Sequence, residues 1–245
     1  ISAARAPPPS SPPQRQDTED TELPRRSRKR RWSFNRSSGR TPLDALVLAA
    51  WCRYGLGDLA GADEFASAAR VEAAVVGTDA DRARAGGIAA EVRLLLDGPD
   101  AALSLVRDVR VHLDRASVDA ALELDRVAAK ALLRAGRLRA ASERLAALPP
   151  GPRVRLLQAS IAITTGRADL VGSLLIDSDG WHLVERVEAA LLRAVADPSA
   201  RPGLVAALED AAATGWVAPF LGHPAKVEAL LLEQPLERLH TRLLD

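Results

Sequence analysis

A repeated unit constrains this chain more than any other feature: a helix ends at a glycine, a short polar turn follows, and a new helix begins. Its copies lie at 53–66, 94–106, 132–145 and 162–175, with turn glycines Gly57, Gly98, Gly136 and Gly166. These glycines are 41, 38 and 30 residues apart, which are the spacings of helical-hairpin repeats. A further turn within 193–208 uses Asp197-Pro198. Because one hairpin cannot bury its apolar face alone, the sequence predicts an all-α, right-handed stack of helical hairpins, a tetratricopeptide-like solenoid.

Two of the copies place a small residue five positions after the turn glycine, Ala62 after Gly57 and Ala141 after Gly136. A small side chain there lets the two helices of a hairpin approach closely, as in the tetratricopeptide repeat. Aromatic residues make up only 3% of the chain. We therefore expect a core of Ala, Leu and Val between closely packed helices. The concave side of such an array would bind peptides or other domains.

The segment 117–136 shows the helical pattern most clearly. Its charged residues follow one another at steps of three and four: Asp119, Glu123, Arg126, Lys130 and Arg134. Apolar residues occupy the opposite side, so the pattern predicts an amphipathic helix with one side against a core. The segment 154–164 is apolar enough to predict a buried helix.

Residues 1–40 differ in composition from the rest. They hold ten basic and four acidic residues, a net charge of +6, whereas the remainder has a net charge of −5. They are rich in Pro and Ser and offer little apolar surface to bury, so we expect 1–40 to be disordered. A helix start at Thr41-Pro42 then opens a helical-repeat domain over 41–245.

The basic stretch within 25–36 interleaves positive charge with aromatic rings. Such a composition suits the backbone of a nucleic acid or an anionic lipid surface, but the preferred interpretation is a solvated linker whose charge keeps it soluble. The candidate nucleic-acid contacts are Arg25, Arg26, Arg28, Lys29, Arg30, Arg31 and Trp32.

No motif of enzyme chemistry is visible in the sequence. There is no phosphate-binding loop, and the glycine-rich 55–61 follows a helix and reads as a hairpin turn. The single cysteine, Cys52, is predicted to belong to the core of an apolar helix. The four histidines lie far apart: His112, His182, His223 and His240. We expect no enzymatic activity, no cofactor, no metal site, no membrane span and a cytoplasmic location.

The stretch "GWVAPFLGHPAK", 215–226, concentrates aromatic side chains and prolines near the end of an aromatic-poor chain. Trp216, Phe220 and His223 are therefore candidates for two roles. They either cap the end of the stack, with the two aromatic rings filling a hollow there, or line a ligand site.

Residues from about 187 onward resemble the last repeat of the helical-repeat region in large LuxR-type regulators of the MalT class, which are common in actinobacteria. The matching residues are Ala207, Leu208, Gly215, Trp216, Pro219, Phe220, Leu221, His223, Pro224, Leu230 and Leu231. Members carry an ATPase module before these repeats and a LuxR-type helix-turn-helix after them, and this sequence has neither. The chain begins with Ile1 and contains no Met, so we interpret it as a fragment or a free-standing repeat protein.

The resemblance implies a non-enzymatic sensor or scaffold for transcription regulation. Such a segment would bind an inducer or a protein partner and would control oligomerisation, so a homo-oligomer is one expected state. It would contact DNA only through the helix-turn-helix that is missing here. Two rivals remain open. One is a free-standing adaptor for protein–protein interaction, and the other is a nucleic-acid-associated protein that acts weakly through 25–36.

Overall fold

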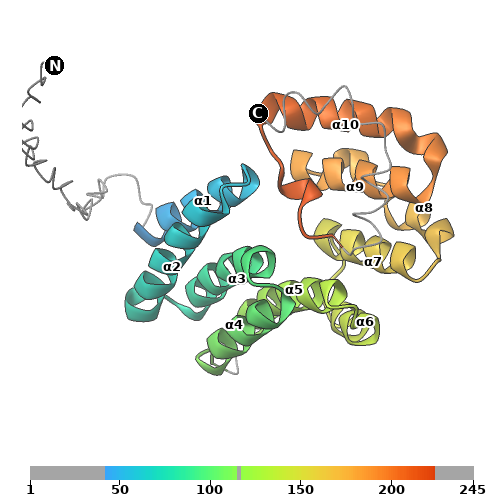
Figure 1. Ribbon diagram of the computed structural model, residues 1–245. Coiled ribbons are helices and arrows are strands. Elements are labelled where there is room, and N and C mark those ends of the chain that lie inside the picture. Colours follow the sequence, from blue (N-terminus) through green and yellow to red (C-terminus); the bar gives the residue numbers. More distant parts are fainter. Residues whose placement is uncertain (1–41, 115–116, 224–245) are drawn as a thin grey trace, which may run out of the picture. The chain divides into compact units, whose positions relative to one another are not determined.

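The computed structural model describes residues 42–114 and 117–223, and within these residues the chain is all-α, with no strand. Figure 1 labels the main helices. Their bounds are α1 Pro42–Gly55, α2 Leu59–Val76, α3 Asp79–Leu96, α4 Pro99–Val111, α5 Val118–Arg134, α6 Leu138–Ala146, α7 Pro152–Thr164, α8 Val171–Leu174, α9 Leu183–Ala196 and α10 Arg201–Thr214. Short 3-10 turns accompany the last three hairpins: η2 Ala168–Leu170, η3 Ser178–Gly180, η4 Pro198–Ala200 and η5 Ala218–Phe220.

The predicted hairpin turns are present. Gly57, Gly98, Gly136 and Gly166 all lie between helices and have φ values of 77°, 90°, 72° and 80°. This left-handed conformation strains any residue with a Cβ, which explains glycine at each turn. Residues 55–61 join α1 to α2, so the interpretation of this glycine-rich stretch as a turn is confirmed.

Helices stack in a regular order. Each α-helix from α1 to α7 packs against the next along the chain, as α8 does against α9 and α9 against α10. In addition, α1 packs on α3, α3 on α5, α5 on α7, and α7 on α9. The odd-numbered helices therefore form one continuous layer, and the even-numbered helices form a second layer that packs against it (Figure 1).

The core consists of Ala, Leu and Val, as expected. Ala62 and Ala141 are fully buried, which confirms close packing where the small residues were noted. α7 buries most of its length, including Leu156 and Ile163, which confirms the predicted buried helix over 154–164. Successive apolar clusters follow the chain from the first hairpin to the last.

Cys52 corrects one expectation, because its side chain is exposed rather than part of the core. The buried face of α1 carries Leu43, Val47, Ala50 and Tyr54, which follow each other at steps of four and three. Position 52 falls between these steps and faces outward. An apolar surrounding sequence therefore did not identify the buried side of this helix. The predicted disordered segment 1–40 lies outside the described residues.

Candidate functional site

Side chains from all five odd-numbered helices converge on one small cavity. Its volume is about 80 Å³. We call this surface the odd-helix face, and its lining residues are Trp51, Tyr54, Glu91, Arg126, Lys130, Arg153, Leu156, Leu157, Glu185, Glu188, Ala218 and Pro219. The convergence follows from the stacking, because antiparallel hairpins place the first helix of each in the same layer. Half of these residues are charged, which is unusual for the interior side of an alanine-rich array.

Glu91 is the centre of the odd-helix face. This α3 residue is 2% exposed and accepts hydrogen bonds from Lys130 Nζ at 2.7 Å and from an Arg126 guanidinium nitrogen at 3.0 Å. Burial by itself raises the pKa of Glu91, but the charges and hydrogen bonds of Lys130 and Arg126 outweigh it and lower the pKa to about 2. Glu91 is therefore ionised throughout the neutral range.

The two cations on α5 are also held by several partners. Arg126 also donates to Glu123 at 2.9 Å, so its guanidinium joins two carboxylates. Burial lowers the pKa values of Arg126 and Lys130, but Glu91 and its neighbours reverse this effect and raise both. Lys130 Nζ donates a further hydrogen bond to the Tyr54 hydroxyl at 3.3 Å. Burial raises the pKa of Tyr54, so the phenol keeps its proton.

Residues from α1, α7 and α9 form the rim of the face. Arg153 donates to Glu185 at 3.2 Å and lies over the Trp51 ring, 5.6 Å from the ring centroid. Trp51 meets Tyr54 edge to face, with 5.6 Å between centroids. Glu188 lines the same cavity, and its charge contributes to the raised pKa values of Lys130 and Tyr54. The rim thus offers one carboxylate and the outer nitrogens of one guanidinium to a ligand.

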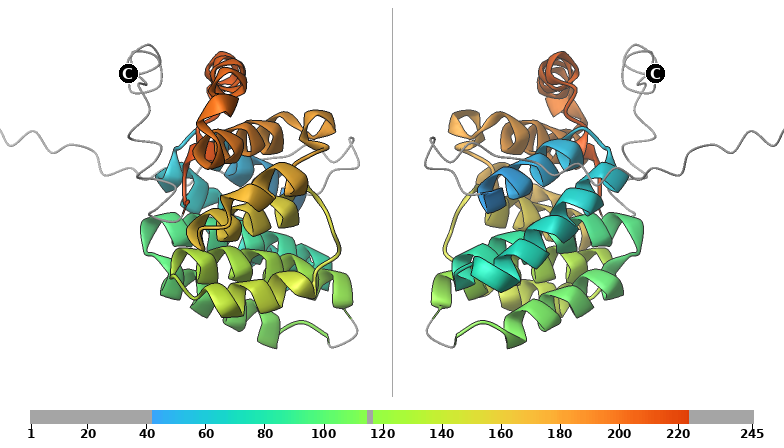
Figure 2. Two further views of the ribbon diagram at one scale, coloured as in Figure 1. Left: turned by 90° about the vertical axis from the view of Figure 1, so that its right-hand side faces the viewer. Right: turned by 90° about the vertical axis from the view of Figure 1, so that its left-hand side faces the viewer.

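The segment after α10, residues 215–223, returns to the first hairpin, and we call it the strap. Gly215 ends α10 in the left-handed conformation, with φ of 72°. The backbone N–H of Val217 then donates to the carbonyl oxygen of Gly55, the last residue of α1, at 2.8 Å. Two views in Figure 2 show this red segment beside the end of the blue α1.

The three candidate residues on the strap have different surroundings. Phe220 packs against the apolar clusters of α9 and α10, at the last hairpin, where a cap was expected. Trp216 instead lies against Gly55 in the first hairpin, because the strap carries it there. His223 is buried, and its Nε2 donates to the carbonyl oxygen of Pro219 at 2.7 Å. The described part of the chain contains no cluster of side chains able to hold a metal ion.

Arg25 to Trp32, the candidate nucleic-acid contacts, lie outside the described residues. Sequence reasoning proposed none of the charged or aromatic lining residues of this face as a site, including Tyr54, Glu91 and Arg153. Two signals could have found the face: Tyr54 is the only tyrosine, and Lys130 is one of three lysines.

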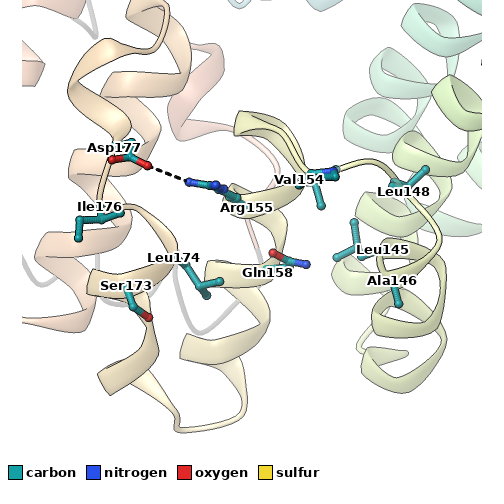
Figure 3. A pocket seen from close by; sticks show the side chains of 11 residues that line it. Leu145, Ala146, Leu148, Val154, Arg155, Gln158, Ser173, Leu174, Ile176 and Asp177 are labelled. Carbon is teal, nitrogen blue, oxygen red and sulfur yellow. Dashed lines mark hydrogen bonds and ion pairs between the residues drawn. The ribbon is translucent and has the colours of Figure 1, made fainter.

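A larger hollow of about 380 Å³ lies between α6, α7 and α8. Figure 3 shows Leu145, Leu148, Val154 and Leu174 around it, with Arg155 and Asp177 paired at its edge. It exists because α8 is only four residues long and leaves part of α7 uncovered. Its lining combines apolar side chains with four polar ones, Arg155, Gln158, Ser173 and Asp177, and the first and last of these pair with each other.

Comparison with protein-family models, curated proteins and solved structures gives no match to this chain. Among the described helices, none is sufficiently long and apolar to cross a membrane. The functional argument therefore rests on the residues of the odd-helix face and the strap.

Proposed function

We propose that residues 42–223 form a non-enzymatic binding domain that receives an inducer or a segment of a protein partner on the odd-helix face. The observation that carries this proposal is the convergence of charged and aromatic side chains from five helices on one cavity. Ligand sites combine apolar walls with a few fixed polar groups. Here Trp51 and Leu156 supply such walls, and Arg153 and Glu188 supply polar groups at the rim.

The ionisation of the face favours recognition over acid–base chemistry. A general acid or base works best with a pKa near the operating pH. The pKa of Glu91 is about 2, and those of Lys130 and Arg126 are raised above their ordinary values. These groups keep one charge at neutral pH, so they orient a ligand and hold the helices without exchanging protons with it.

The resemblance of the last hairpin and the strap to LuxR-type, MalT-like regulators supports a place in transcription regulation. In that setting the array is a right-handed tetratricopeptide-like solenoid, and ligand binding governs oligomerisation of neighbouring modules. The alternative is a free-standing adaptor for protein–protein interaction. The nucleotide sequence beyond the codon for Asp245 separates the two, because an in-frame helix-turn-helix supports the regulator.

The binding proposal is tested by screening the full chain against small-molecule and peptide libraries by thermal shift. Hits are then titrated against Arg153→Ala and Glu188→Gln, two substitutions on the rim. The matched control is Arg139→Ala, because Arg139 lies on α6 and its side chain is 94% exposed. We expect at least a tenfold loss of affinity in the rim variants and none in the control. Hits whose affinity survives both rim substitutions contradict the proposal.

The basic segment 25–36 favours a second function on compositional grounds alone. Its seven positive charges would bind a nucleic acid through backbone contacts, without reading sequence. This function is compatible with the first, because it uses a different part of the chain.

A further inference from the structure

The strap has an unusually close fit to the first hairpin. A Cβ at Gly55 would lie 2.6 Å from the Trp216 ring, and a Cβ at Gly57 would lie 2.7 Å from a methyl group of Val217. Both positions therefore need glycine while the strap is in place. The hydrogen bond from Val217 N–H to the Gly55 carbonyl fixes the register of this contact.

The strap also covers the odd-helix face. Ala218 packs beside the cluster that contains Tyr54, and Pro219 lines the cavity with Glu91 and Lys130. Further along, a Cβ at Gly222 would lie 3.8 Å from the Lys130 side chain. The cavity that remains is about 80 Å³, well below the roughly 300–1,000 Å³ of sites for drug-sized ligands. With the strap in place, the face admits only a very small molecule.

The two sides of the strap are held differently. Phe220 is embedded between α9 and α10, its own hairpin. Toward α1 the strap makes one backbone hydrogen bond and apolar contacts, and Trp216 is only half-buried. Residues 215–222 carry no charged side chain, so no ion pair ties them to the first hairpin. We therefore expect the contact of the strap with α1 to break before the contact of Phe220 with α9 and α10.

We propose that the strap is an intramolecular occupant of the odd-helix face, and that a partner or inducer reaches the charged cluster only when the strap leaves α1. This inference rests on the proposed function for the identity of the face as a binding site. It adds a device for regulation: occupancy of the face is coupled to the position of residues 215–223. A partner segment that binds there replaces the strap's own contacts with Gly55 and Tyr54.

The test uses Gly55→Val in the full chain, which forces side-chain atoms into the space of the Trp216 ring. The matched control is Gly172→Val, because Gly172 also lies in a helix and a Cβ there meets no atom within 4 Å. Hydrogen exchange and amine acetylation are measured on both. We expect at least tenfold faster exchange of the Val217 amide and at least fivefold faster acetylation of Lys130. Lys29 is the internal reference, and exchange across 183–214 stays unchanged.

Trp216→Ala is the second variant, which covers the case in which Gly55→Val fails to fold. It removes the same contact without adding atoms, so it also accelerates exchange at Val217. Unchanged Val217 exchange and Lys130 acetylation in the folded variants would overturn the inference. The two proposals fail separately. If the hits from the library screen bind wild type and Gly55→Val equally, the strap is no competitor. If the strap is released but no hit depends on the rim, the binding function is wrong.

Discussion

Replacement of Glu91 by Gln removes one charge from a buried cluster and keeps the shape of the side chain. Arg126 and Lys130 would then remain buried without their shared carboxylate, because both bond to Glu91. Breaking a buried ion pair on one side costs about 3–5 kcal/mol. The pKa gives an independent figure. A shift from 4.5 to about 2 corresponds to about 3 kcal/mol of stability at neutral pH.

The sign of the pH effect follows from the lowered pKa. The ionised carboxylate stabilises the folded state above pH 4.5, the ordinary value, and this contribution disappears as the pH falls toward 2. Other carboxylates with lowered pKa values, such as Asp79 and Asp81, also lose stability in acid. The difference between wild type and Glu91→Gln isolates the effect of Glu91 from theirs.

Urea unfolding followed by circular dichroism measures this difference. At neutral pH we expect Glu91→Gln to lower the urea midpoint by roughly 1–3 M, because the loss is about 3 kcal/mol and slopes for small proteins are about 1–3 kcal/mol per molar. The two midpoints should converge as the pH falls from 5 toward 2. The control is Glu143→Gln on α6, whose partner Arg139 is almost fully exposed. Exposed pairs contribute about 0.2–1 kcal/mol, so its midpoint should barely move. A difference that stays constant from pH 7 to 2.5 would refute the central role of Glu91.

Three further predictions concern other parts of the chain. Limited proteolysis should remove residues 1–40 and leave the cooperative helical unfolding transition; loss of that transition would show that the two regions fold together. Any affinity for DNA should fall steeply with salt and vanish when 25–36 is deleted, as an electrophoretic or fluorescence titration measures; sequence-selective binding after deletion contradicts this. Phe220→Ala should cost up to about 3 kcal/mol and speed hydrogen exchange over 199–223 while 42–150 stays protected, since each repeat mainly contacts its neighbours.

Local patterns predicted the hairpins because the residues that decide them are neighbours in sequence. Gly57 and Gly136 mark turns that need a left-handed residue, and Ala62 and Ala141 stand where two adjacent helices cross. Each signal depends on a few consecutive positions. The bounds of α5, Val118–Arg134, follow closely from the charge pattern of 117–136.

The charged cluster could not be predicted in the same way. Charges at 123, 126 and 130 indicated the side of α5 that faces water, yet the side chains of Arg126 and Lys130 are only 11% and 20% exposed. Their partner Glu91 lies 35 and 39 positions upstream, on another helix. Charge periodicity identifies a polar side of a helix but does not say whether water or a carboxylate faces it. That depends on how the hairpins stack, as does the contact of Trp216 with Gly55.

The bond between Val217 and Gly55 joins positions 162 residues apart. The hairpins, by contrast, close over a few residues each, and chains rich in local contacts fold quickly. Closing so long a loop lowers the entropy of the chain. The contacts of the strap offset this loss only after the intervening helices are in place. The strap should therefore dock in the last step of folding, as a phase that follows the gain of helical signal and that Trp216→Ala abolishes.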